Sequence, residues 1–285
     1  MCKKLLSISL LLLAATFHLY AQQRTPAEIP FTLTGQGHIM IKASVNGIEG
    51  NFIFDTGAGL NLLTKKFADK VGSVKKTEGF YVGHRATGEA IETDIYLIDH
   101  LKLGTTDIAG QKTAVLDVNF PLDGLISLMP FKDIPLTIDY TNKKLVLGNI
   151  PKDGKTIPLQ ISADRDITLG ISTYVKLNDR LPVQISLDSG AGNGIFRFNA
   201  RYIQTLNIDT TNTTKRTIVS DFDTTKTNNS YTTTLDKIST LNGVSSASGV
   251  KGTFIEGLIY EGIGSINWLG NSITIDVPGK RMIVK

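Results

Sequence analysis

The chain contains Phe52-Ile53-Phe54-Asp55-Thr56-Gly57-Ala58-Gly59, and a second stretch follows the same pattern, Ile185-Ser186-Leu187-Asp188-Ser189-Gly190-Ala191-Gly192. The two aspartates lie 133 residues apart (188 − 55). Each stretch is a short apolar run that ends in an aspartate, followed by a small hydroxyl residue and a glycine. Burying a carboxylate without a partner costs free energy. The two aspartates are therefore expected to be partners of each other.

The similarity extends beyond these stretches and predicts an internal duplication. Residues 39–54 and 171–187 both indicate a hairpin that leads into the aspartate, the first with an Asn46-Gly47 turn and the second with a turn near Asn178-Asp179. Residues 136–147 and 273–284 both indicate a closing pair of strands, in which Asp139 and Asp276 form the turns.

Composition predicts an all-β fold, because most periodic segments are short, rich in Val, Ile, Thr and Tyr, and separated by Gly, Asn or Asp. Helices are expected only at about 62–71 and 198–206. Residues 74–103 indicate a strand pair with its tip at 83–88, and residues 209–234 are its expected counterpart in the second half. The join between the halves falls near 148–154, where periodicity breaks.

The N-terminus has the pattern of a secretory signal peptide over residues 1–21. Lys3 and Lys4 precede an apolar stretch, and Ala21 ends it as a small residue at the expected cleavage site. The expected domains are a signal peptide (1–21), an N-terminal lobe (22–150) and a C-terminal lobe (151–285). We expect a periplasmic or secreted protein with no stable membrane insertion after cleavage.

Several function classes receive little support. Cleavage would remove the only cysteine, Cys2, and would lower the formal charge from +4 to about +2 (4 − 2, for Lys3 and Lys4), which does not favour a nucleic-acid partner. The histidines lack metal-ligand spacing, so neither a metal nor another cofactor is expected. The glycines after each aspartate do not complete a dinucleotide-binding pattern, and no serine lies in a nucleophile elbow.

Two facing aspartates can support hydrolysis. Carboxylates held about 3 Å apart cannot both ionise, so they share one proton. One then acts as a base towards a water molecule while the other acts as an acid towards a carbonyl oxygen. Asp55 and Asp188 are the expected catalytic residues.

The neighbouring residues have expected supporting roles. The hydroxyls of Thr56 and Ser189 would bond to backbone across a pseudo-twofold axis. Gly57 and Gly190 would allow a sharp turn and present amides to the carboxylates. The small residues expected to leave room for a bound substrate backbone are Ala58 and Ala191.

Asp55-Thr56-Gly57-Ala58 and Asp188-Ser189-Gly190-Ala191 resemble the catalytic motif of the aspartic peptidases, and the alanine is closer to the retroviral type than to pepsin. The family also has two apolar residues and a glycine downstream of each aspartate, forming a strand behind it. Leu125-Ile126-Ser127 and Gly262-Ile263-Gly264 are similar to that element. The resemblance implies a single-chain aspartic peptidase with two β-barrel-like lobes and one catalytic aspartate in each.

Two departures from the family pattern affect local packing: Ser127 replaces a glycine, and Gly262 replaces an apolar residue. The tip around 81–88 is a candidate flap. The expected substrate is a polypeptide bound in extended form by a monomeric enzyme. A non-catalytic peptide-binding module that keeps the fold is the alternative, and a peptidase for one dedicated partner is a third possibility.

Overall fold

The structure is a computed structural model that describes residues 26–220 and 225–285. Its regular structure is almost entirely β-strand, which confirms the all-β prediction. The predicted signal peptide, residues 1–21, lies outside the described residues. None of the described helices has the length and hydropathy needed to cross a lipid bilayer.

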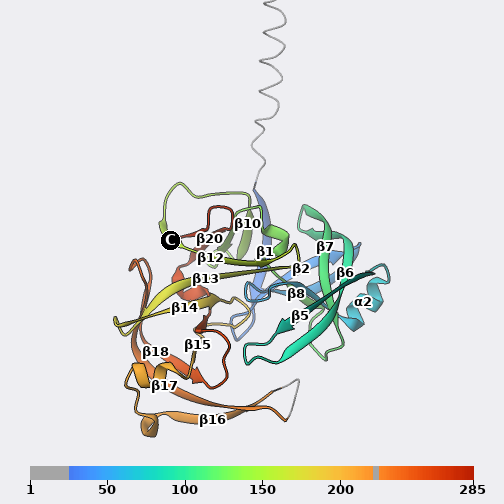
Figure 1. Ribbon diagram of the computed structural model, residues 1–285. Coiled ribbons are helices and arrows are strands. Elements are labelled where there is room, and N and C mark those ends of the chain that lie inside the picture. The colour runs from blue at the N-terminus through green and yellow to red at the C-terminus, as the bar shows by residue number, and fades with distance from the viewer. Residues whose placement is uncertain (1–25, 221–224) are drawn as a thin grey trace, which may run out of the picture.

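The first half of the chain forms a closed barrel of six strands. Neighbouring strands in the ring are β2-β3-β8-β4-β7-β6, and β6 pairs back to β2. We call this half of the chain, which contains the barrel and an attached hairpin, the first lobe (Figure 1). Its elements are β1 (Ala27–Leu33), β2 (Ile39–Val45), β3 (Ile48–Phe54), β4 (Asn61–Thr64), α2 (Lys65–Val71), β5 (Lys75–His84), β6 (Ala90–Leu103), β7 (Thr106–Leu116), β8 (Gly124–Ile126), η1 (Met129–Phe131), β9 (Leu136–Asp139) and β10 (Lys144–Leu147).

The second half repeats this arrangement strand for strand. Its ring runs β13-β14-β19-β15-β18-β17, and β17 pairs back to β13. We call it the second lobe. Its elements are β11 (Lys155–Pro158), β12 (Gln160–Asp164), β13 (Thr168–Leu177), β14 (Leu181–Leu187), β15 (Phe196–Asn199), α3 (Tyr202–Thr205), η2 (Thr210–Asn212), β16 (Thr214–Val219), β17 (Thr227–Thr240), β18 (Ser246–Ile255), β19 (Gly262–Gly264), η3 (Asn267–Leu269), β20 (Ser272–Asp276) and β21 (Arg281–Val284).

A sheet shared by both halves joins the lobes. Its strand order is β11-β21-β20-β9-β10-β1, so each half of the chain supplies three strands. At its centre β9 pairs with β20, and Thr137 lies opposite its own counterpart, Thr274. Their hydroxyls are 2.7 Å apart and buried. Contact between equivalent residues marks the pseudo-twofold axis that relates the lobes.

The hairpins that lead to the aspartates form as the sequence predicts. Asn46 and Gly47 turn the first hairpin with positive φ angles of 47° and 89°. Asn178 and Asp179 turn the second with φ angles of 49° and 53°. Short polar residues and glycine tolerate this left-handed conformation better than other residues.

Both helices were predicted to begin at an earlier residue than they do in the structure. Residues 61–64 form strand β4, and only Lys65–Val71 is helical. Likewise Phe196–Asn199 forms strand β15 before the single turn of α3. The apolar residues at these positions complete the barrels beside β8 and β19, and this tertiary pairing overrides the local helical pattern.

Candidate active site

Asp55 and Asp188 directly follow equivalent strands, β3 and β14. Each of these strands pairs in parallel with a short strand behind it, β8 or β19. The pairing continues into the aspartates: the Asp55 amide donates to Ile126 O and the Asp188 amide to Gly264 O, both at 2.9 Å. The backbone of each aspartate is therefore fixed by its own lobe.

Thr56 and Ser189 connect the two strand ends across the lobe boundary. Thr56 Oγ1 donates to Leu187 O at 2.8 Å, and Ser189 Oγ donates to Phe54 O at 2.9 Å. Each hydroxyl also accepts a 3.0 Å hydrogen bond from the amide of the other residue. Both residues are buried. These four bonds set the position of one aspartate relative to the other.

Gly57 and Gly190 allow each turn to lie against the opposite carboxylate. A Cβ atom on Gly57 would lie 2.4 Å from Cγ of Asp188, and a Cβ atom on Gly190 would lie 2.4 Å from Cγ of Asp55. Both distances are far below van der Waals contact. The structure therefore brings the two predicted catalytic aspartates together, each beside the glycine turn that follows the other.

Backbone amides hold the carboxylates. Asp55 Oδ1 accepts from the amide of Gly57 at 2.8 Å and from that of Ala58 at 3.1 Å. The Ala191 amide donates to Asp188 in the second lobe. The two carboxyls also share a hydrogen bond. Asp188 Oδ1 is buried and accepts no hydrogen bond from the described residues.

Burial and mutual repulsion shift the titration of the pair. Burial raises the pKa of Asp188 to about 7, assisted by the negative charge of Asp55 and opposed by the Ala191 amide and the positive charge of Arg197. Burial also raises the pKa of Asp55, although the amides of Gly57 and other residues oppose the shift. The pair therefore retains one proton at mildly acidic pH and titrates as a unit.

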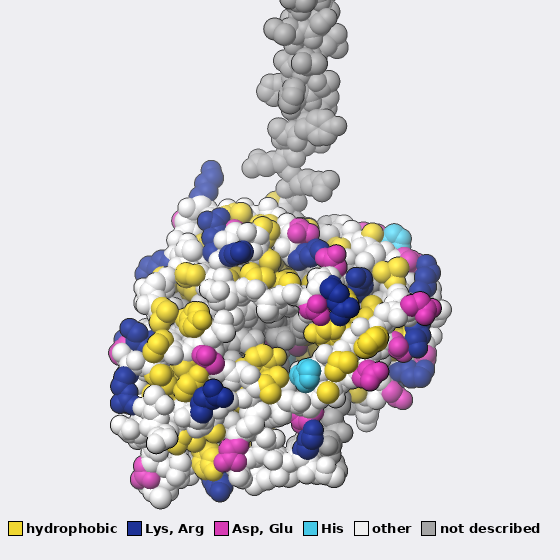
Figure 2. Space-filling model, viewed as in Figure 1, with side chains coloured by type: hydrophobic (Ala, Val, Ile, Leu, Met, Phe, Trp, Pro, Cys, Tyr) yellow, Lys and Arg dark blue, Asp and Glu magenta, His cyan; other side chains and the backbone are white. Residues whose placement is uncertain are grey.

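The β5–β6 hairpin reaches from the first lobe to the second (Figure 1). At its tip, which we define as residues 85–89, Ala86 O accepts from the amide of Ile259 at 2.9 Å. Glu89 is 4% exposed and accepts from the hydroxyls of Ser220 and Thr87. The tip therefore bridges the two lobes. Figure 2 shows a face that is hollowed near its centre, between the lobes.

Tyr260 lies on the segment that the hairpin tip contacts. Burial raises its pKa, with further contributions from Tyr81 on the hairpin and from Asp188. These contributions indicate that Tyr260 lies near both Tyr81 and Asp188. Tyr81 belongs to the candidate flap segment, whereas nothing in the sequence indicated a role for Tyr260.

The alignment of the elements behind the aspartates differs by one residue from the predicted one. Leu125 lies opposite Ile53, and Ile263 lies opposite Ser186, at the equivalent position. The counterpart of Ser127 is therefore Ser265. Both serines are fully buried. Because the two lobes carry a serine at this position, Ser127 does not make the first lobe locally different from the second.

The two serines bond to the strand beside them. The Ser127 amide and hydroxyl donate to Asn61 Oδ1 at 2.9 and 3.1 Å. Ser265 Oγ accepts from the Ile195 amide at 2.7 Å and donates to Ile195 O at 3.1 Å. A buried serine is therefore hydrogen-bonded in both lobes, as a buried hydroxyl requires.

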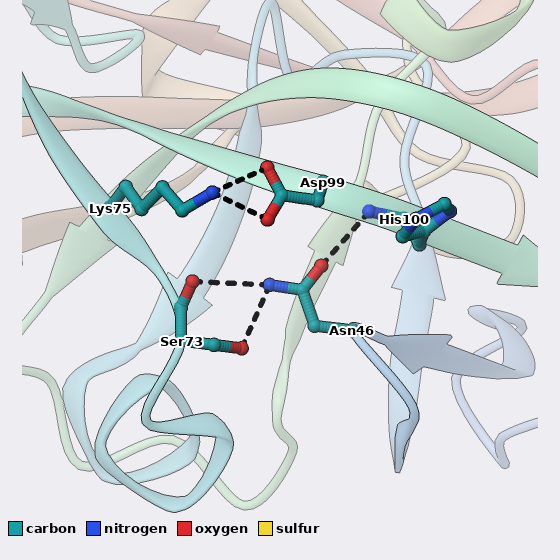
Figure 3. Close-up of polar contacts among 5 residues, drawn as sticks. All are labelled: Asn46, Ser73, Lys75, Asp99 and His100. Carbon is teal, nitrogen blue, oxygen red and sulfur yellow. Dashed lines mark hydrogen bonds and ion pairs between the residues drawn. The ribbon is translucent and has the colours of Figure 1, made fainter.

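A separate polar cluster lies on the surface of the first lobe (Figure 3). The Asn46 side chain donates to Ser73 O and Oγ, and its Oδ1 accepts from the amide of His100 at 2.9 Å. Lys75 and Asp99 form an ion pair at 2.7 Å beside it. These contacts fix the β2–β3 turn to the segment after α2, so the cluster is explained by folding.

Across the described part of the chain, no group of three or more His, Cys, Asp or Glu side chains could hold a metal ion.

Sequence reasoning missed Arg197, although a signal was present. It is the only charged residue in the apolar run Ile195-Phe196-Arg197-Phe198. The register of β15 with β19 makes it the counterpart of Leu62, since Arg197 lies opposite Ile263 and Leu62 lies opposite Leu125.

Part of the chain is similar to a known protein family. Residues 41–129 match the family described as Aspartyl protease. Among solved structures, a retropepsin-like aspartic protease from Rickettsia conorii is 23% identical in sequence and covers 43% of this chain and 91% of its own, with a TM-score of 0.34. No curated protein gives a significant match.

The all-β fold, with two equivalent lobes and paired Asp-hydroxyl-Gly turns, resembles the bilobal fold of the aspartic peptidases. The match over residues 41–129, in the first lobe, is to the family described as Aspartyl protease, and it confirms the resemblance to aspartic peptidases predicted from the sequence.

Proposed function

We propose that the protein is an aspartic endopeptidase in which Asp55 and Asp188 activate one water molecule between them. The observation that carries the proposal is the reciprocal contact in which each carboxylate lies against the glycine turn after the other. A purely structural aspartate needs no such counterpart. The raised pKa of Asp188, about 7, supports a pair that keeps one proton where most carboxyls have lost theirs.

The proposed reaction uses only the shared proton and the water. The ionised carboxylate removes a proton from the water, whose oxygen attacks the carbonyl carbon of the scissile bond. The protonated carboxyl donates its proton to the carbonyl oxygen, giving a tetrahedral diol. A proton then passes from the pair to the amide nitrogen, the carbon–nitrogen bond breaks, and a new carboxyl and a new amine leave. Asp188 Oδ1 is buried and accepts no hydrogen bond within the described residues, so a hydrogen bond from the water would satisfy it.

The supporting residues have separate parts in the proposal. Thr56 and Ser189 keep the carboxylates at a fixed separation through their exchanged hydrogen bonds. Gly57 and Gly190 allow the close approach, and their amides donate to Asp55. Ala58 and Ala191 leave space for the substrate backbone.

The substrate would be an extended polypeptide lying between the lobes under the β5–β6 hairpin, adding strand-like hydrogen bonds. We further propose a monomeric, exported enzyme without a cofactor. Its two halves would descend from an internal duplication, which the identical strand order of the two barrels supports.

The test is cleavage of an unfolded protein by residues 22–285 at pH 4 to 8, analysed by mass spectrometry. Asp55→Asn and Asp188→Asn are each expected to lower kcat by at least about a thousandfold, because either change removes the shared acid and base. Asp139→Asn is the matched control, since the carboxylate of this repeated aspartate accepts hydrogen bonds from its own turn, among them those from the amide and side chain of Asn142.

The outcome also separates the alternative. A non-catalytic binding module would bind unfolded peptide tightly in both the wild-type and Asp55→Asn proteins and cleave it in neither. Cleavage that survives both substitutions would exclude this pair as the catalytic residues.

A further inference from the structure

Arg197 introduces a positive charge on one side of the aspartate pair only. The guanidinium acts electrostatically on Asp188. Its counterpart near Asp55 is Leu62, which is apolar. The two lobes therefore differ in charge at equivalent positions beside the proposed catalytic residues.

The strand β15 directs Arg197 away from the hydrophobic core. Its neighbours Phe196 and Phe198 are buried, and Phe198 packs on Phe254 at a centroid distance of 5.6 Å. Successive side chains of a strand point to opposite faces. Arg197 therefore lies on the other face of this sheet.

That other face is the one contacted by the hairpin tip. Arg197 lies directly opposite Ile263, which packs in a small apolar cluster with Ile255 and Leu258. Ala86 of the hairpin tip packs against the same cluster. The register thus positions Arg197 on the surface that lies under the hairpin, where an extended substrate would pass.

Arg197 acts electrostatically on Asp188 without forming an ion pair with it. Within residues 26–220 and 225–285, Arg197, a half-buried residue, forms no side-chain hydrogen bond and no ion pair. A partly desolvated guanidinium is stabilised by a carboxylate, which it can bind through two parallel hydrogen bonds. A substrate carboxylate would supply a hydrogen-bonded partner that the described residues do not provide.

From this geometry we propose that Arg197 is a specificity-determining residue, which binds an acidic side chain of the substrate on the Asp188 side of the scissile bond. The inference rests on the proposed peptidase function and adds a substrate preference to it. Because Leu62 occupies the equivalent position in the first lobe, the acidic preference should apply to one side of the scissile bond and not to the other.

The test uses pairs of fluorogenic octapeptides. Their sequence is taken from a site at which the enzyme cleaves the unfolded substrate protein. The two peptides of a pair differ only by Glu or Gln at one position, and each position on both sides of the scissile bond is sampled at about pH 6, where glutamate is ionised. The measured quantity is the ratio of kcat/KM for Glu over Gln. We expect roughly a tenfold ratio or more at a single position, the size of one charge-assisted hydrogen-bonded pair.

Variants assign the preference to Arg197. Arg197→Leu copies the residue of the first lobe, so the site can accept it, and the ratio should fall to about one. Arg197→Glu should instead favour Lys over Gln at the same position. Arg201→Leu is the matched control, because Arg201 is exposed beyond the end of β15, and it should leave the ratio as in the wild type.

A ratio isolates recognition from catalysis. Loss of Arg197 also removes a charge that acts on Asp188, but this change affects both peptides of a pair equally. A wild-type ratio near one at every position, or a preference that persists in Arg197→Leu, overturns the inference.

A binding measurement distinguishes failure of the inference from failure of the proposed function. Kd values of the same Glu and Gln peptides are measured with the Asp55→Asn protein, which binds without turnover. If the wild-type protein cleaves nothing, the peptidase proposal fails, yet the Kd ratio still decides whether Arg197 recognises a carboxylate. A Kd ratio near one at every position rejects the role of Arg197 independently.

Discussion

Thr56 and Ser189 exchange equivalent hydrogen bonds, each hydroxyl donating to the strand that carries the other residue and accepting from the other residue's amide. Such an exchange between equivalent residues is the arrangement expected at a pseudo-twofold axis. The same axis passes between the hydroxyls of Thr137 and Thr274 in the shared sheet. The lobes are therefore fixed to each other at two levels, one at the aspartates and one in the shared sheet.

The exchange predicts a coupled loss of stability. Thr56→Val and Ser189→Ala should each lower the free energy of unfolding by about 1–3 kcal/mol, because each leaves buried partners without a hydrogen bond. The double variant should lose less than the sum, since the two residues share the same bonds. Chemical denaturation measures these values. Thr93→Val on the surface of β6 is the control, with an expected change within about 0.5 kcal/mol. Strict additivity would contradict the shared network.

The glycine turns predict a steric effect. Gly57→Ala and Gly190→Ala should each lower the melting temperature and abolish peptide cleavage, because the new methyl group would lie 2.4 Å from a carboxylate carbon of the opposite lobe. Gly35→Ala is the matched control, since nothing lies within 4 Å of a Cβ atom there and its φ angle is not positive. If the Gly57→Ala protein were as stable as the Gly35→Ala protein, the Gly57 turn would not lie against the carboxylate of Asp188.

The sequence alone predicted the strands best where turn chemistry and alternation agreed, as in the hairpin ending at Asp55. The helix prediction failed at 62–64 and 198–199, because apolar residues there join a barrel whose other strands are remote in sequence. Because the motif occurs twice, the sequence also predicted that Asp55 and Asp188 are partners. The sequence did not reveal the role of Arg197. The role of a single charged residue in an apolar run depends on the face of the sheet on which its side chain lies.

The titration of Asp188 predicts how stability depends on pH. Its pKa rises from 3.8 in the unfolded chain to about 7 in the folded protein, so the folded protein binds the proton more tightly. This contribution to stability is complete below about pH 4 and is lost as pH rises through about 7. The free energy of unfolding of the Asp188→Asn protein should therefore rise relative to that of the wild type between about pH 4 and pH 7, by on the order of a few kcal/mol.

Denaturant unfolding at pH 4, 5.5 and 7.5 measures the difference between the two proteins. In the Asp55→Asn protein the pKa of Asp188 should be lower, because the negative charge of Asp55 helps to raise it. The pH range over which Asp188 changes the stability should therefore be narrower. A constant difference between wild type and Asp188→Asn across this range would show that the carboxyl titrates normally.

The same pair predicts the pH dependence of cleavage. The proposed reaction needs one proton on the pair, so kcat/KM should fall as pH rises above about 7, where the second carboxyl ionises. The profile is measured with a Gln-containing octapeptide, whose own charge is constant over this range. Because the aspartates titrate together, the apparent pKa belongs to the pair. A rate that increases steadily to pH 9 would indicate a different catalytic group.

The hairpin tip predicts a local effect of Glu89. The hydroxyls of Ser220 and Thr87 hold the pKa of Glu89 at about 2, below its usual value of 4.5. The carboxylate therefore stabilises the docked tip fully above about pH 4.5, and this contribution is lost as pH falls towards 2. Glu89→Gln should weaken the contact between the lobes by about 1–2 kcal/mol, which corresponds to roughly fivefold to thirtyfold faster hydrogen exchange at the Ile259 amide.

Hydrogen exchange followed by mass spectrometry at pH 7 reports this amide through peptides that cover residues 256–262. The expected acceleration is confined to these peptides and to those covering residues 84–90, since the Ile259 amide donates to Ala86 O in the tip. Glu92→Gln is the matched control, because Glu92 is exposed on the same hairpin. Equal exchange in the Glu89→Gln and Glu92→Gln proteins would show that Glu89 does not hold the tip, and docking would then depend on Ala86 and the apolar cluster around Ile263.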